Sequence, residues 1–195
     1  MSDPNKHYDW EHIVLAPLEE SDIDLLFVWQ NSARLRDLTM GFRFPIQKEA
    51  IRDWMRDLRA QNGRSKVVYA IRRNGVFCGL AQLNDVDPYQ RKATFGIYIG
   101  DSAQRNVGIG YVATALMLDY AFNALDLRKV SLEVVAVNHN AVRLYDNLGF
   151  VREGVRRSEY FIGGQYQDTL MYGLLKEEFG VAIPTSAQRL CYSPQ

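Results

Sequence analysis

The sequence predicts a single-domain α/β protein in which a central helix crosses between two parallel strands. Apolar, β-branched runs bounded by turn residues alternate along the chain with segments of helical periodicity. The resulting order, β-α-α-β-β-β-α-β-α-β-β, spans residues 12–176, and a chain of 195 residues has a usual length for one such domain. Residues 1–11 are then an N-terminal extension, and residues 177–195 are a C-terminal tail.

Helix caps and tight turns predict the first half of this order. Ser21 stands before acidic residues and an apolar periodicity, which predicts the N-cap of a first helix. Residues 31–45 are expected to form a loop or a broken helix, and residues 47–61 a second, amphipathic helix. Asn-Gly at 74–75 predicts a tight hairpin, and Asp-Val-Asp-Pro at 85–88 predicts the next turn of a three-stranded meander.

The second half of the order contains two helices, one strand and a hairpin. The expected elements are a helix over residues 111–125, a strand over 129–137, a helix over 142–148 closed by Gly149, and hairpin strands over 151–161 and 167–175. The residues after 180 show little periodicity. We expect a loose tail there, or an arm that packs on a neighbouring copy and would suit a homodimer.

A glycine-rich turn between a strand and a helix is the most informative local pattern. It reads Arg105-Asn106-Val107-Gly108-Ile109-Gly110 and follows the apolar run 94–99. Glycines lack a Cβ and let a ligand approach the backbone, and the first N–H groups of the next helix lack intrahelical partners and lie at its positive end. We therefore predict an anion site here, suited to a phosphate or a pyrophosphate.

Two better-known phosphate loops fit this turn less well. The Walker motif requires Gly-Lys-Ser/Thr, whereas Tyr111 follows Gly110. The dinucleotide-binding motif would place its third glycine at Ala113 and its acidic residue near Val130. Alanine is allowed at that third position, so a nicotinamide-dependent enzyme stays an alternative. A turn that only connects two elements is another alternative.

A second motif lies further along the chain, at the end of the predicted strand 129–137. It reads Asn138-x-x-Ala141-x-x-Leu144-Tyr145-x-x-x-Gly149-Phe150. Taken with Arg105-x-x-Gly108-x-Gly110, in this order and with a strand before each motif, it resembles the GNAT superfamily of acyl-CoA-dependent N-acyltransferases. The resemblance covers most of the chain and implies a mixed, mostly antiparallel sheet with helices on both faces.

The resemblance also implies that acetyl-CoA is the acyl-donor substrate. The glycine-rich turn would bind its pyrophosphate, and the pantetheine arm would lie in a gap between strands 95–99 and 129–137, where unpaired backbone groups can bind it. Asn138 would hydrogen-bond the arm, cap the following helix, or do both. The residues implied in donor binding are Ile97, Tyr98, Ile99, Arg105, Asn106, Val107, Gly108, Ile109, Gly110 and Asn138.

Two side chains are the candidate catalytic groups. Tyr145 occupies the place of the family's general acid, and a protonated phenol can donate to a departing thiolate. Its alternative role is a core aromatic. Glu133 is a carboxylate in an apolar strand, where burial would raise its pKa and suit it to act as a base. Its alternative role is an ion pair with Lys129 or with a neighbouring strand; further candidates for the base are Glu159 and Asp168.

The amine acceptor is the least determined part of the function. The hairpin sequence is similar to the RimJ/RimL-like branch, whose members acetylate ribosomal-protein N-termini, spermidine or nucleotide-linked amino sugars. The loop after the first helix and the final hairpin are rich in arginine, which suits an anionic amino-sugar nucleotide. Spermidine, a ribosomal-protein N-terminus, a merely solvated basic face and a non-catalytic acyl-CoA-binding module are the alternatives. The arginines concerned are Arg34, Arg36, Arg43, Arg152, Arg156 and Arg157.

Composition argues against several other classes of protein. The formal net charge is zero, so no nucleic-acid or membrane partner is expected. The two cysteines, Cys78 and Cys191, lack metal-ligand spacing, and no metal is expected. The first ten residues are polar and unlike a secretory signal, so we expect a reduced, cytoplasmic protein.

Overall fold

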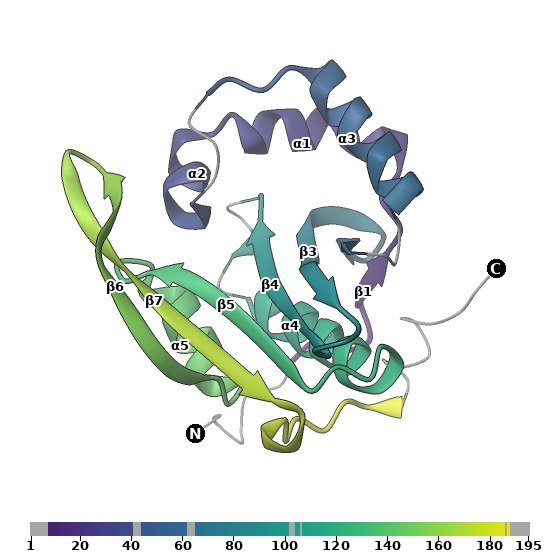
Figure 1. Cartoon of the computed structure of the whole chain (residues 1–195). Coiled ribbons are helices and arrows are strands. Elements are labelled where there is room, and N and C mark those ends of the chain that lie inside the picture. Colours follow the sequence, from purple (N-terminus) through teal and green to yellow (C-terminus); the bar gives the residue numbers. More distant parts are fainter. Residues whose placement is uncertain are drawn as a thin grey trace.

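One seven-stranded sheet organises the chain (Figure 1). The computed structural model describes residues 8–40, 44–61, 65–101, 104–105, 107–185 and 187. The strand order is β1-β2-β3-β4-β5-β7-β6. The pair β4 and β5 is parallel, and the other five pairs are antiparallel. The predicted mixed, mostly antiparallel sheet is therefore confirmed.

The element order agrees with the predicted one, except that a third helix lies between β1 and β2. This helix, α2, falls in the segment expected to be a loop or a broken helix. The strands are β1 Ile13–Ala16, β2 Val67–Arg73, β3 Val76–Asp87, β4 Lys92–Ile99, β5 Lys129–Val135, β6 Val151–Ile162 and β7 Gln165–Leu175; the helices are α1 Ile23–Gln30, α2 Ala33–Thr39, α3 Lys48–Gln61, α4 Ile109–Asp119 with a π-helical turn over Tyr120–Ala124, and α5 His139–Asn147.

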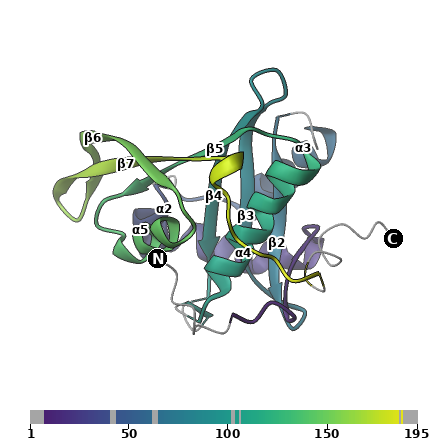
Figure 2. The same cartoon turned by 90° about the horizontal axis from the view of Figure 1, so that it is seen from below.

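Helices cover both faces of the sheet, each over its own apolar cluster. On one face, α1, α2 and α3 pack over side chains of β2 and β3 such as Ala70 and Leu80. On the other face, α4 crosses the strands and α5 lies beside it, as the view from below shows (Figure 2). Because neighbouring residues of a strand point to opposite faces, β4 places Phe95 in the α4 cluster and Tyr98 against the α1–α3 cluster.

Two predicted turns differ from the structure. Helix α1 begins at Ile23, after a 3₁₀ turn, so the prediction that Ser21 is its N-cap is wrong. The Ser21 hydroxyl instead donates to the Glu19 carboxylate over 3.4 Å. The turn predicted at 85–88 lies later, because β3 continues to Asp87, whose carboxylate accepts hydrogen bonds from the next backbone N–H groups. In contrast, the Asn-Gly hairpin is confirmed, with positive φ at both positions 74 and 75.

The described part of the C-terminal tail packs on this chain's own core. Phe179 lies against Phe122, with ring centroids 5.5 Å apart, and Ala187 is 1% exposed within the α4 cluster. Helix α4 is apolar on all sides, so its outer side also needs an apolar cover. The expectation of a loose tail, or of an arm on a neighbouring copy, is corrected for these residues. Residues 188–195 lie outside the described part.

Candidate functional site

Strands β4 and β5 separate part of the way along their length. They pair only over Lys92–Thr94 and Lys129–Ser131. Beyond this point β4 continues to Ile99 and β5 to Val135 without pairing to each other. The backbone groups on the facing edges therefore lack sheet partners and can bind a ligand. This divergence is the gap that the family resemblance implied.

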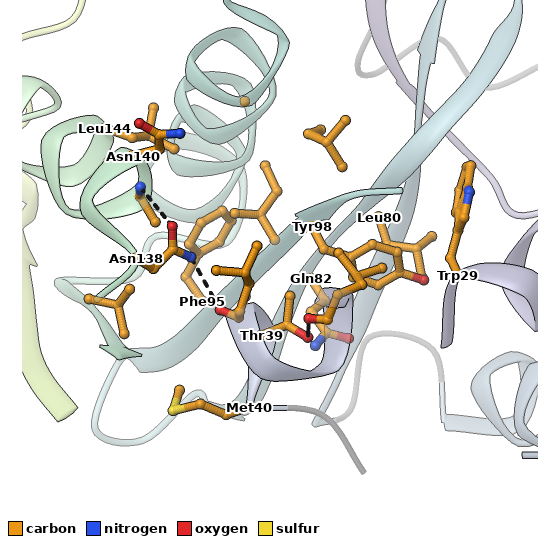
Figure 3. A pocket seen from close by; sticks show the side chains of 18 of the residues that line it. Trp29, Thr39, Met40, Leu80, Gln82, Phe95, Tyr98, Asn138, Asn140 and Leu144 are labelled. Atoms are coloured by element: carbon orange, nitrogen blue, oxygen red, sulfur yellow. Dashed lines mark hydrogen bonds between the residues drawn. The ribbon is translucent and has the colours of Figure 1, made fainter. Parts of the chain in front are cut away.

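A cavity of about 1150 Å³ runs through this gap. Its walls come from both faces of the sheet, since α1, α2 and α3 line it on one side and α4 and α5 on the other. Figure 3 shows part of this lining, with Trp29 of α1 and Leu144 of α5 on opposite sides of β4. The predicted donor-site residues in the walls are Ile97, Tyr98, Ile99, Arg105, Gly108, Gly110 and Asn138, and the predicted catalytic residues are Tyr145 and Glu133.

The two glycines of the turn are required for different reasons. Gly108 has φ +91°, and an added Cβ would lie 3.1 Å from the Tyr8 ring, so the backbone itself favours glycine. Gly110 has ordinary helical geometry, and an added Cβ would meet only Leu144, at 3.6 Å. The packing around Gly110 would therefore tolerate a side chain, although this residue faces the cavity. Such an open position fits a glycine that leaves room for a ligand.

Two other residues of the turn offer only their backbone to a ligand. Ile109 is buried in the α4 cluster, and the Val107 side chain is exposed and outside the cavity walls. Only the main chain of these two residues can serve a phosphate. Asn106, which was also predicted to bind the donor, lies outside the described residues.

Arg105 fastens the turn to the end of β4. Its Nε donates to the Ile99 carbonyl over 3.0 Å, and its Nη2 donates to the Gly100 carbonyl over 3.1 Å. Burial lowers the pKa of this guanidinium, and the nearby Arg34 adds to that effect. An arginine still remains charged at neutral pH. The side chain is thus neither free in solvent nor an isolated anion ligand, and it brings a positive charge to the cavity wall.

The backbone of β4 faces the gap at alternate residues. The Gly100 N–H donates to Cys78 of β3 over 2.9 Å, whereas the Ile99 carbonyl points away from β3 to Arg105. Because both backbone groups of a residue in an antiparallel strand point the same way and alternate along the strand, the groups of Ile97 also face the gap. The Tyr98 side chain extends instead toward the α1–α3 face.

Asn138 links the two halves of the cavity wall. Its Oδ1 accepts the Ala141 N–H over 3.3 Å at the start of α5, so the predicted capping role is confirmed. Its Nδ2 donates to the Leu38 carbonyl of α2 over 3.2 Å, as the dashed line in Figure 3 shows. Each end of the amide retains capacity for one further hydrogen bond. The sequence could not show the contact with α2, because it joins residues 100 positions apart.

Tyr145 places a buried phenol in the cavity wall. The side chain is 5% exposed and packs edge-on against Phe150, with Tyr172 also in ring contact. Its hydroxyl makes no hydrogen bond within the described part of the chain, and burial alone raises the pKa of this phenol well above its ordinary value. Tyr145 is therefore a protonated donor whose hydroxyl has no hydrogen-bond partner among the described residues. It is also a core aromatic, so the two interpretations hold together.

Glu133 is in a different environment from the predicted one. Its side chain is 34% exposed, and its carboxylate pairs with Arg156 of β6 over 2.9 Å, whereas Lys129 pairs with Glu153. The expected burial is therefore corrected, because one side of β5 opens to the cavity. The second candidates lie outside the cavity walls: Glu159 approaches Arg156 at 3.6 Å, and Asp168 accepts the Ser158 N–H over 2.8 Å.

One side of the cavity is formed mainly by α1–α3 and the strands beneath them. Of the arginines noted in the sequence, Arg36 lines this cavity, and Arg34 lines a smaller neighbouring pocket of about 610 Å³. Arg43 lies outside the described residues, and the hairpin arginines lie outside the cavity walls. The sequence did not indicate three of the lining residues: Trp54, Lys66 and Gln82.

Neither a cluster of metal-binding side chains nor a membrane-spanning helix is found among the described residues. No cluster of three or more His, Cys, Asp or Glu side chains there is placed to hold a metal ion. No helix of this part of the chain is long and apolar enough to cross a membrane.

Comparisons with known proteins point to one family. The acetyltransferase (GNAT) domain model matches residues 12–151. The spermidine N(1)-acetyltransferase of Escherichia coli (strain K12) is 29% identical over 180 residues, which cover 91% of this chain and 94% of that protein. The Bacillus subtilis (strain 168) protein YdaF, provisionally named a ribosomal N-acetyltransferase, is 28% identical over 176 residues, covering 87% and 94%.

A solved structure shares the fold of this chain. The crystal structure of spermidine N-acetyltransferase from Vibrio cholerae in complex with CoA and spermine superposes with a TM-score of 0.79. The two chains are 25% identical, and the match covers 86% of this chain and 97% of that one. With its family match over more than half of its length, the chain belongs to the GNAT acetyltransferase family, whose members transfer acetyl groups from acetyl-CoA to amines.

Proposed function

We propose that this chain acetylates a primary amine by direct attack of the amine on the thioester of acetyl-CoA. The observation that carries the proposal is the cavity that passes through the β4–β5 gap and has walls on both faces of the sheet. A donor can then enter from the glycine-rich turn while the acceptor approaches from the α1–α3 side. Holding both reactants together in this way lowers the entropic cost of the reaction.

The chain's own backbone supplies the donor site in this proposal. The N–H groups of the turn and of the first residues of α4 bind the pyrophosphate, and the open side of Gly110 gives it access. The backbone groups of Ile97 and the N–H of Ile99 bind the pantetheine amides along the gap. Arg105 holds the turn and strand β4 together through the Ile99 and Gly100 carbonyls. Asn138 uses its remaining hydrogen-bonding capacity for the arm.

Tyr145 acts as the general acid in this mechanism. Tyr145 lines the cavity, its hydroxyl makes no hydrogen bond in the described part of the chain, and burial keeps it protonated. The departing thiolate of CoA needs a proton or a hydrogen-bond donor, and a positioned phenol supplies one. The ring contacts with Phe150 and Tyr172 fix the direction of the hydroxyl.

Glu133 assists removal of the amine's proton. It is the carboxylate of the described cavity wall, and its ion pair with Arg156 holds it in place. A partly exposed carboxylate can receive the proton through water and pass it to solvent. Arg156 is therefore a positioning residue, because it acts on the reaction through Glu133.

The relatives and the residues of this chain suggest different acceptors. The relatives named above act on spermidine or are provisionally assigned to ribosomal substrates, which favours these alternatives. The arginines of the sequence suggested an amino-sugar nucleotide, but no comparison supports it. Of those arginines that the structure describes, only Arg36 lines the cavity. The acceptor that we propose is therefore a small-molecule primary amine, without a narrower class.

Release of free CoA thiol from acetyl-CoA, measured across an amine panel, tests the proposal. The panel contains spermidine, a peptide with a free N-terminus and an amino-sugar nucleotide. Amine-dependent thiol release with at least one of them is expected. CoA binding without release in the presence of any amine would favour the alternative of a non-catalytic acyl-CoA-binding module.

A further inference from the structure

Three polar side chains form a floor to the acceptor side of the cavity. Lys66 precedes β2, Gln82 lies on β3 and Tyr98 on β4, and all three line the cavity. Their strands are adjacent, with Val68 paired to Gln82 and Leu80 paired to Tyr98. Since alternate residues of a strand share a face, Lys66 lies on the same face as Val68. We call these three side chains the polar floor; Figure 3 shows Gln82 and Tyr98 side by side, with Trp29 of α1 beyond them.

No member of the polar floor has a hydrogen-bond or ion-pair partner in the described part of the chain. The Lys66 ammonium lies 5.7 Å from the centre of the Trp54 ring, and no described carboxylate is within 4 Å of it. The Tyr98 hydroxyl is buried without a hydrogen-bond partner. Burial raises the pKa of Tyr98, and the nearby Gln30 side chain partly opposes this rise. The Gln30 amide and the Tyr98 hydroxyl nevertheless lack the geometry of a hydrogen bond. The Gln82 amide likewise makes no hydrogen bond with any described residue.

The described residues of helices α1, α2 and α3 place no carboxylate in the walls of the acceptor side of the cavity, which we call the acceptor chamber. Their five acidic residues all lie outside the cavity walls: Asp24, Asp37, Glu49, Asp53 and Asp57. Of these, Asp24 pairs with Lys48, Glu49 with Arg52 and Asp53 with Arg56. Burial lowers the pKa of Lys66, and Asp85 only partly opposes this effect. An ammonium that loses water on burial gains most from an anion. A polycation would instead place a second positive charge beside it.

We propose that the acceptor amine carries an anionic group, a carboxylate or a phosphate, which binds Lys66, with Gln82 and Tyr98 as further hydrogen-bond donors. This inference rests on the proposed function and narrows its acceptor from any primary amine to an acidic one. Trp54 and Trp29 form the apolar sides of the chamber around the rest of the molecule.

Matched pairs of amines test this preference. One pair is glucosamine 6-phosphate and glucosamine, and the other is 4-aminobutyrate and butylamine; spermidine is the polycationic member of the set. Within at least one pair the anionic amine should show a kcat/KM at least about tenfold higher, the size of one charge-assisted hydrogen bond. The two pairs separate a preference for phosphate from one for carboxylate.

Variants of Lys66 assign the preference to a single charge. In Lys66→Met, which keeps the long side chain, KM for the anionic amine should rise about tenfold while kcat changes little. In Lys66→Glu, the order should invert in favour of spermidine. Lys176→Met is the matched control, because Lys176 pairs with Asp126 and lies outside the cavity walls. Tyr98→Phe should raise the same KM by a smaller factor.

Fluorescence gives a readout that does not depend on turnover. Trp29 and Trp54 line the chamber, so titration of the CoA-loaded protein with each amine should change their emission. Equal kcat/KM within both pairs, or a preference for spermidine, would overturn the inference and leave acetyl transfer intact. If no amine is acetylated, the proposed function fails. In that case the fluorescence titration decides the inference. The inference requires that an anionic amine binds and that Lys66→Met weakens this binding. If no anionic amine binds, or if Lys66→Met binds it equally well, the inference is refuted.

Discussion

At the scale of single residues, the proposed proton transfer depends on the hydroxyl of Tyr145. This phenol is buried, is protonated and has no hydrogen-bond partner among the described residues, so its removal leaves no other buried group unpaired. We expect Tyr145→Phe to lower kcat by about ten- to a hundredfold, the usual scale of a lost general acid, with little change in the Kd of CoA. Steady-state kinetics and a CoA titration check this, with the exposed Tyr89→Phe as control. An unchanged kcat would remove Tyr145 from this role.

Two buried phenols also predict how stability depends on pH. Burial raises the pKa of both Tyr98 and Tyr145 in the folded state above the value in the unfolded chain, about 10. Their contribution is therefore complete below pH 10 and is lost as the pH rises through the higher folded-state pKa values. Between these values each phenol should lower the free energy of unfolding by up to about 1.4 kcal/mol per pH unit. Urea unfolding at pH 8 to 11 measures this slope, and the double variant Tyr98→Phe/Tyr145→Phe should reduce it. Equal slopes for both proteins would contradict the assigned cause.

At the scale of elements, Gly110 at the start of α4 affects both the stability of the helix and the binding of CoA, and one substitution can separate the two effects. An alanine at Gly110 would meet only Leu144, at 3.6 Å, and alanine favours a helix by up to about 1 kcal/mol over glycine. Gly110→Ala should therefore keep or raise the free energy of unfolding, yet weaken CoA binding by about tenfold because the methyl group obstructs the pyrophosphate. Calorimetry and thermal unfolding check both signs. Gly180→Ala is the control, since that position has open space around it. Unchanged CoA affinity in Gly110→Ala would place the phosphate elsewhere.

Asn138 couples helices α2 and α5, and the two contacts can be tested apart. Asn138→Asp keeps an oxygen that accepts the Ala141 N–H but replaces the donor to the Leu38 carbonyl with an acceptor. We expect α2 to loosen and the free energy of unfolding to fall by about 1 kcal/mol. Hydrogen exchange should then be faster in α2 and unchanged at the start of α5. In Asn138→Ala, both segments should exchange faster. Equal protection of α2 in Asn138→Asp and the parent would show that the Leu38 contact is unimportant.

At the scale of the whole molecule, the sequence predicted the features that are local in the chain. The glycine-rich turn and the Asn138 to Phe150 motif each lie within a few residues, so their spacing was visible, and the order of strands and helices followed from periodicity. The divergence of β4 and β5 came from the family resemblance. The prediction that Ser21 caps α1 was wrong because a 3₁₀ turn precedes this helix. A capping pattern in the sequence does not show whether a 3₁₀ turn or an α-helix follows it.

The features that were not predicted depend on contacts between distant residues. The ion pair of Glu133 with Arg156 crosses an intervening strand, β7, that separates β5 from β6. The acceptor chamber brings Trp54 of α3 over Lys66, and neither residue carries a motif. One feature of the sequence does indicate the packing of Phe179 on Phe122. Helix α4 is apolar on all sides, so its outer face also requires an apolar cover.

Direct acetyl transfer through this cavity is the central claim, and one measurement tests it most directly. Purified protein is incubated with acetyl-CoA and an accepted amine, and thiol release is followed while mass spectrometry weighs both the amine and the protein. The account predicts one acetyl group on the amine for each thiol released, none on the protein, and rates of both signals about ten- to a hundredfold lower in Tyr145→Phe. Thiol release that needs no amine, or an acetyl group that accumulates on the protein, would contradict it.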